Sequence, residues 1–210
     1  MRFLRHSLIL LCLFSRAALY AQDAGEDIPI ESDWSGYLPS VYSRGDQTFN
    51  FNIGPVFPLF YVDSEEGVLP TKMNMGGMAA LSYNYFLGPH LFLGGELSGA
   101  FFSTEGKNNY FIVPIGARIG YQFIVKRFEF PLMLSAGAAL QQRLGGSYFG
   151  LYAKPSAGVF FRYSPDWSFG VMTSFWWVPQ WTNKPYEGHP KDIDIHGFFL
   201  EASIGVRYHF

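Results

Sequence analysis

The sequence predicts an all-β protein, an eight-stranded antiparallel up-and-down β-barrel that crosses a membrane. Apolar and polar residues alternate with a period of two in eight separate stretches, as expected of β-strands. The apolar face of each stretch lacks Asp, Glu, Lys and Arg. Short and long connections between the stretches also alternate, which is typical of bacterial outer-membrane barrels.

Residues 1–21 are predicted to be a signal peptide. Arg2 and Arg5 precede the short apolar run 7–14, and Ala21 offers a small residue for cleavage. This run is too short to span a bilayer as a helix. Cys12, the only cysteine, lies within it, so the exported chain would have no thiol for a disulfide or for catalysis.

Residues 22–46 are predicted to be an acidic N-terminal periplasmic segment, and residues 47–210 the barrel. The whole chain has 15 basic and 17 acidic residues. Loss of Arg2, Arg5 and Arg16 with the signal peptide would leave 12 basic residues against 17 acidic ones, a net charge of about −5. Because the basic residues are scattered, we expect no nucleic-acid partner.

The first four strands are predicted at about residues 48–61, 73–86, 90–102 and 110–125. In the first, Phe49, Phe51 and Ile53 share one face, and Asn50 and Asn52 share the other. The others keep this pattern, so each has one face suited to hydrocarbon and one suited to a polar interior.

The last four strands are predicted at about residues 128–142, 149–163, 167–178 and 197–210. In the last, Leu200 and Ile204 lie on the apolar face, whereas Glu201 and Arg207 lie on the other. A Lys or Arg facing lipid at mid-depth would cost about 2–4 kcal/mol, so this segregation favours a membrane barrel.

The connections differ in length on the two rims. Those after strands two, four and six are only a few residues long, whereas the others are longer or glycine-rich and cover residues 63–72, 103–109, 143–147 and 179–195. An even number of strands then places both the N-terminus and the C-terminus on the periplasmic side. His90 and His209 fall at that end, where we expect them at the membrane interface.

A soluble β-sandwich or a lipocalin-like barrel also has alternating strands, but it buries the apolar face and exposes the polar one. Here the polar face is rich in Gly, Ala and Ser, as expected where side chains crowd the narrow interior of eight strands.

Strand direction sorts the inward residues by height. Seven mostly apolar residues are expected in the outer half, as a candidate site for a small hydrophobic ligand: Val56, Met78, Phe102, Ile112, Tyr152, Trp176 and Phe199. Four charged residues are expected at mid-height, as a paired network in the lumen: Glu96, Arg118, Lys154 and Glu201.

The chain resembles the small eight-stranded outer-membrane proteins, above all the OmpW family and more distantly the membrane domain of OmpA. The resemblance rests on Gly45-Asp46, on the stretch 53–58 (IGPVFP), and on the closing stretch 203–210 (SIGVRYHF). It implies a narrow channel for small hydrophobic molecules in the outer membrane. It also implies that Phe210 is read by the barrel-assembly machinery.

Two alternatives remain open. A closed structural barrel would use the same inward residues as filling, and a surface-interaction barrel, an adhesin or antigen, would use its outer loops. A lipid-modifying enzyme is less expected, because no His-x-Ser motif is present.

Asp192, Asp194 and His196 could bind a metal or form an Asp-His dyad, but a solvated polar rim explains them better. We therefore expect no cofactor, no metal and no catalysis.

Overall fold

The computed structural model describes residues 41–104, 109–143, 146–182 and 193–210. These ranges contain eight long strands and one short one: β1 (Gln47–Asp63), β2 (Gly67–Leu69), β3 (Gly76–Phe86), β4 (Leu91–Ser103), β5 (Asn109–Val125), β6 (Phe128–Arg143), β7 (Gly146–Arg162), β8 (Trp167–Thr182) and β9 (Ile193–His209). The predicted signal peptide and most of the predicted N-terminal segment lie outside the described residues.

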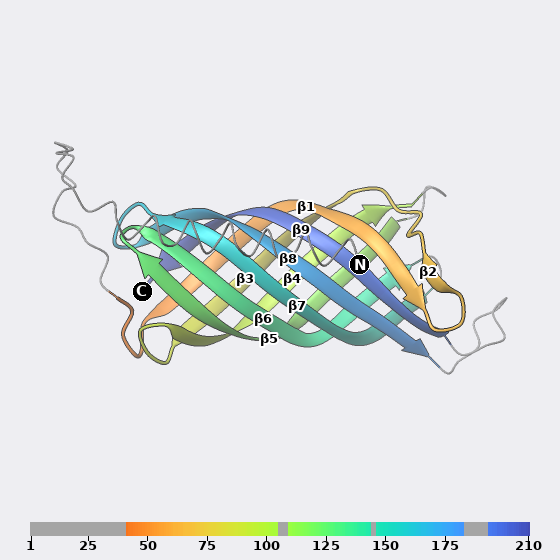
Figure 1. The fold of residues 1–210 in the computed structure, drawn as a ribbon, viewed down its shortest axis with the longest axis horizontal. Helices are drawn as coiled ribbons and strands as arrows, with labels where there is room; N and C mark the ends of the chain where they lie inside the picture. The colour runs from red at the N-terminus through yellow and green to blue at the C-terminus, as the bar shows by residue number, and fades with distance from the viewer. Residues whose placement is uncertain (1–40, 105–108, 144–145, 183–192) are drawn as a thin grey trace, which may run out of the picture. The chain divides into compact units, whose positions relative to one another are not determined.

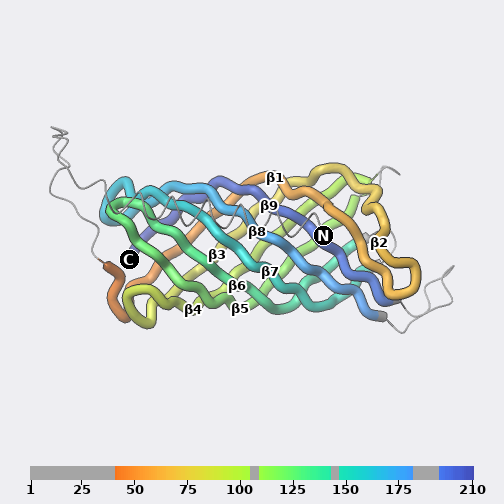
Figure 2. The backbone as a smooth tube through the Cα atoms, in the orientation of Figure 1, coloured from red at the N-terminus to blue at the C-terminus, as the bar shows by residue number. Residues whose placement is uncertain are grey.

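The eight long strands form one closed antiparallel barrel. Each long strand pairs with the next along the chain, and β1 pairs with β9 from Thr48↔His209 to Asp63↔Ile195. Figures 1 and 2 show this closure, with the orange β1 beside the blue β9 and all strands tilted against the barrel axis. The predicted fold class is therefore confirmed.

The barrel has two distinct ends. The end that carries the start of β1 and the finish of β9, here called the terminal end, also carries the short turns after β3, β5 and β7. The tightest of these is Lys126-Arg127, where Lys126 has a positive φ of 55°. The opposite end, here called the loop end, carries the β1–β2 hairpin and the connections 104–108, 144–145 and 183–192.

Alternation sets the two faces of the wall. On β1, Phe49, Phe51 and Ile53 are exposed on the outside, whereas Asn50 and Asn52 are buried inside. The same pattern runs through the other long strands. A barrel with an apolar outer face and a polar interior is stable in hydrocarbon and not in water. Within the described ranges, no helix is long and apolar enough to cross a membrane.

Three details at the loop end differ from the prediction. Residues 67–69 form β2, which pairs with β1 from Tyr61↔Leu69 to Asp63↔Gly67, inside a stretch predicted to be a loop. The strand predicted from residue 73 begins at Gly76, because its pairing with β1 ends at Val56↔Gly76. The connection after β6 is shorter than predicted, since β6 and β7 pair up to Arg143↔Gly146.

Candidate functional site in the barrel interior

The seven residues predicted to line a ligand site all lie together inside the loop-end half of the barrel. They come from seven strands and belong to one buried group, here called the apolar cluster, which also contains Tyr110 and Val178. The rings of Phe102 and Phe199 are 5.2 Å apart, and those of Phe102 and Tyr110 are 6.0 Å apart. None of the seven is more than 4% exposed, so these side chains fill the space that a ligand would occupy.

Two glycines of the wall lie close to rings of the apolar cluster. A Cβ at position 116 would meet the backbone carbonyl of Ala136 first and would lie 2.8 Å from the Tyr152 hydroxyl. A Cβ at position 76 would meet the backbone carbonyl of Phe101 first and would lie 2.7 Å from the Phe102 ring. Glycine at both positions therefore lets the adjacent strand and the ring approach closely.

The four charged residues predicted at mid-height form one buried network, here called the central charge network. Lys154 pairs with Glu96 and lies 3.5 Å from Glu201 Oε2, and Arg118 Nη2 lies 3.5 Å from Glu96 Oε2. The indole Nε1 of Trp176 donates to Glu201 Oε2 at 2.8 Å. The network thus forms the floor of the apolar cluster and is joined to it through Trp176.

Hydroxyl groups complete the network. Ser135 Oγ donates to Glu96 Oε2 at 3.0 Å, and Ser203 Oγ donates to Glu201 Oε1 at 2.8 Å. The two carboxylates and the two cations are thus paired with one another, as buried charges require. Arg118 Nε and Nη1 are buried without a hydrogen-bond partner among the described residues.

A second network occupies the terminal end of the lumen and is here called the terminal network. Glu129 Oε1 forms an ion pair with Arg162 Nε at 2.8 Å, and Glu129 Oε2 accepts a hydrogen bond from Arg207 Nη1 at 2.6 Å. Arg207 Nε also donates to Asn50 Oδ1 at 2.8 Å, and Gln122 Nε2 donates to Glu129 Oε2 at 3.1 Å. This level of the lumen is filled as well.

His209 and Tyr42 also belong to the terminal network. The alternation of the last strand puts His209 on the polar face with Glu201 and Arg207, but we expected its ring at the membrane interface. That expectation is wrong, because the ring is buried in the lumen, 2.7 Å from Ser168 Oγ and 2.9 Å from Arg162 Nη2. Tyr42 precedes β1, yet it is 4% exposed and its hydroxyl donates to Glu129. Burial raises the pKa of Tyr42, so its phenol stays neutral at ordinary pH.

Of the predicted rim candidates, Asp192 falls outside the described residues, and Asp194 and His196 lie outside the lumen. Asp194 Oδ1 lies 3.3 Å from His196 Nε2, and Trp177 Nε1 donates to His196 Nδ1 at 3.3 Å. His196 Nδ1 thus accepts a hydrogen bond and Nε2 faces the Asp194 carboxylate. The part of the chain that the structure describes contains no group of three side chains able to hold a metal.

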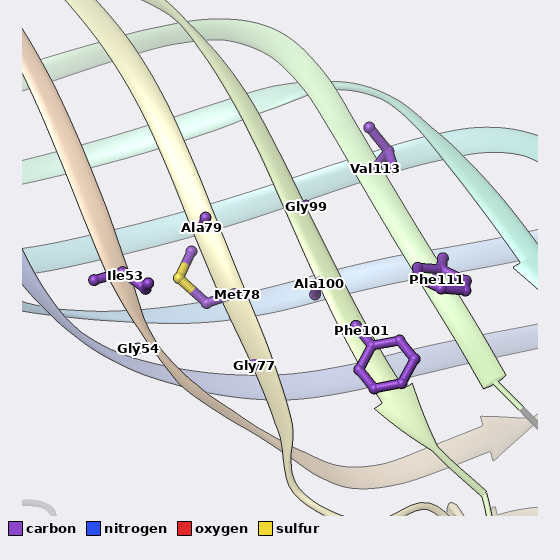
Figure 3. Close-up of a pocket in the computed structure, with 10 residues that line it drawn as sticks. All are labelled: Ile53, Gly54, Gly77, Met78, Ala79, Gly99, Ala100, Phe101, Phe111 and Val113. Carbon is purple, nitrogen blue, oxygen red and sulfur yellow. The ribbon is translucent and has the colours of Figure 1, made fainter. Parts of the chain in front are cut away.

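A shallow apolar hollow of about 440 Å³ lies on the wall formed by β1, β3, β4 and β5. Figure 3 shows its lining, with Phe101 and Phe111 beside the side-chain-free positions Gly77 and Gly99. Its lining also includes Met78 and Ala100, which belong to the apolar cluster. The hollow on the wall therefore borders two residues of the apolar cluster, which is packed on the inner side of the same strands.

Solved structures with the same fold are outer-membrane barrels. Neisserial surface protein A matches with a TM-score of 0.53 and 15% identity over 79% of this chain and 97% of its own. The outer membrane protein OprG from Pseudomonas aeruginosa matches with a TM-score of 0.54 and 11% identity over 80% of this chain and 97% of its own. At these identities the likeness shows the fold alone.

Two curated relatives are uncharacterised proteins of Treponema pallidum (strain Nichols). One is 35% identical over 139 residues, which is 66% of this chain and 61% of the relative. The other is 29% identical over 140 residues, 62% of this chain and 48% of the relative. The chain thus spans about half to three fifths of the length of these relatives.

One protein-family model matches residues 27–208, a range that contains nearly all of the barrel. The chain therefore belongs to that family, and its barrel has the eight-stranded fold of bacterial outer-membrane proteins.

Proposed function

We propose that the protein is a closed outer-membrane barrel whose lumen is structural and whose interactions are made by its surfaces. The observation that carries this proposal is the filling of the lumen at three successive heights. The apolar cluster, the central charge network and the terminal network each consist of side chains that are almost completely buried. A water-filled passage would require all three layers to open.

The energetics support a closed lumen. Opening the apolar cluster to water would expose rings such as Phe102 and Phe199, at roughly 25 cal/mol for each Å² of apolar surface. Opening the central charge network would separate Lys154 from Glu96 and Glu201, but the entering water would hydrate these charges and offset much of that loss. The apolar cluster is therefore the layer that mainly favours the closed state in the resting barrel.

The proposal places the terminal end in the periplasm and the loop end outside the cell. Lipid is then the partner of the outer face, and Phe210, 67% exposed, is available to the barrel-assembly machinery. At the loop end, Val68, Phe149 and Met75 are more than 60% exposed and offer apolar contacts to an extracellular partner. The proposal assigns the protein no catalysis, no cofactor and no nucleic-acid partner.

A second candidate is an OmpW-like narrow passage for small hydrophobic molecules. Two features favour it. One is the apolar cluster, and the other is the wall beside it, where β1 and β3 are no longer paired on the loop-end side of Val56↔Gly76. The hollow on that wall includes Met78 in its lining. A solute displacing the cluster could leave sideways there, without crossing the charged layers.

Electrical recording in planar bilayers separates an open lumen from a closed one. We expect the folded full chain to produce no discrete conductance steps at several voltages, while heat-dependent gel mobility of the same preparation shows that it is folded. Reproducible single-channel steps from the unaltered protein would overturn the closed barrel.

Methyl NMR in lipid nanodiscs adds the test for the hydrophobic passage. Octane would shift the buried Met78 and Ile112 methyl signals if it enters the apolar cluster. Ile204, 65% exposed on the outer wall, is the internal control, because its methyls contact lipid in either case. The closed barrel predicts no change at Met78 and Ile112 beyond that at Ile204.

A further inference from the structure

We propose that the segment before β1 is a stopper, and that the terminal mouth of the barrel is a binding site for a phenol, occupied in this chain by Tyr42. The inference rests on the proposed closed barrel and deepens it, because it assigns closure of one mouth to a single side chain. The socket consists of Glu129, Arg162, His209 and Phe86.

The polar half of the socket recognises the hydroxyl. Tyr42 donates to the Glu129 carboxylate, whose two oxygens lie 3.1 Å and 3.0 Å from the phenol oxygen. That oxygen also lies 3.1 Å from His209 Nδ1. A hydrogen bond to an ionised carboxylate is stronger than one between neutral groups, so this contact selects an O–H donor.

The apolar half of the socket recognises the ring. Tyr42 stacks on Phe86 with ring centroids 3.7 Å apart and an angle of 7° between the planes. The guanidinium carbon of Arg162 lies 4.9 Å from the Tyr42 ring centroid. The ring is thus in contact with an aromatic face and a cation, which suits an electron-rich aromatic ligand.

The local charge balance explains why an aromatic ring is needed there. The terminal network contains two arginines and one carboxylate, so it has an excess positive charge in a buried place. The guanidinium carbon of Arg207 lies 4.1 Å from the Phe160 ring centroid, and the guanidinium of Arg162 lies over the Tyr42 ring. Removing Tyr42 would uncover Arg162 and Glu129 at the mouth.

A tight turn aims Tyr42 back into the barrel. Ser43 N donates to Asp46 Oδ2 at 2.8 Å, and Gly45 has a φ of 105°, which favours glycine. Gly45 N donates to Phe86 O at 3.0 Å, and Phe86 N donates to Asp46 O at 2.8 Å. The chain is therefore fixed to the wall on one side of Arg44 by the backbone and on the other side by Tyr42.

Tryptic cleavage after Arg44 measures release of the stopper. Arg44 is exposed, but a protease needs its flanking chain to leave the socket, and the cleavage rate reports how often that happens. In the folded full chain, we expect Tyr42→Ala to raise the rate of this cleavage about tenfold or more. Tyr42→Phe keeps the ring and loses the hydrogen bonds, so it should raise the rate less. Val41→Ala is the matched control, because Val41 is exposed, and it should leave the rate unchanged.

Direct binding to the emptied socket completes the test. p-Cresol, which is the tyrosine side chain as a free molecule, should raise the midpoint of thermal unfolding of Tyr42→Ala and leave the unaltered protein unchanged. Toluene, which lacks the hydroxyl, should have a smaller effect. Cleavage of Tyr42→Ala at the unaltered rate, or equal effects of p-cresol and toluene, would overturn the stopper. Conductance of the unaltered protein would instead overturn the closed barrel, so the two failures are distinguishable.

Discussion

Glu129 joins two arginines and a tyrosine at the terminal end of the lumen, and it is completely buried. Replacing it with Gln keeps its shape and removes its charge, which leaves Arg162 and Arg207 without a buried counter-ion. We expect Glu129→Gln to lower the free energy of unfolding by about 3–5 kcal/mol. Urea titration of the protein in lipid, followed by gel mobility, measures the change.

Glu66→Gln is the control for that substitution. Glu66 is exposed in the turn of the β1–β2 hairpin, where the loss of a surface charge should change stability by less than about 0.5 kcal/mol. Equal effects of the two substitutions would contradict the terminal network.

The sequence predicted correctly which residues face the lumen. It did not predict how their side chains pack there. Period-two alternation alone places Glu96, Arg118, Lys154 and Glu201 on one side of the wall, and the structure brings them into contact. It does not determine whether the rings around Trp176 leave a gap or close it, because that depends on the relative heights of side chains from seven strands. Tyr42 could not be found at all, since no strand pattern includes it.

At the scale of single strands, the decisive property is the absence of charge on the outer face. Ile204 lies near the middle of β9, opposite Ile53 on one side and Val171 on the other, and is 65% exposed. We expect Ile204→Lys to destabilise the protein by about 2–4 kcal/mol in a bilayer, because the charge would face hydrocarbon. Urea titration in lipid vesicles gives the value.

Val68→Lys provides the comparison at the loop end. Val68 lies on the β1–β2 hairpin and is 71% exposed, where the proposed orientation places it in water. Its substitution should cost no more than about 1 kcal/mol. If both lysines were tolerated equally, the outer face of β9 would not be in lipid.

The long strands were predicted within a few residues of their observed ends, apart from the loop end. There, β8 continues to Thr182 and β9 begins at Ile193, beyond the predicted limits. Alternation fades in these extensions because they no longer separate lipid from a filled lumen. The strand β2 was missed for the same reason, since both of its faces are largely exposed.

For the whole molecule, closure of the wall and filling of the lumen are linked. Pairing of β1 with β9 leaves the eight-stranded sheet without an open edge along most of its length, which a chain in hydrocarbon requires. An eight-stranded barrel encloses only enough space for side chains or one small ligand. The large inward residues Trp176, Arg207 and Tyr152 use that space.

Spin labels on the outer wall test this account most directly. Labels at Val113, Leu134 and Ile204 in lipid vesicles should relax with oxygen, which concentrates in hydrocarbon, and should be shielded from a water-soluble nickel chelate. These three residues lie on β5, β6 and β9 and are exposed on the outer face. Ready access of the chelate to the three labels would show an aqueous surround and contradict the membrane barrel.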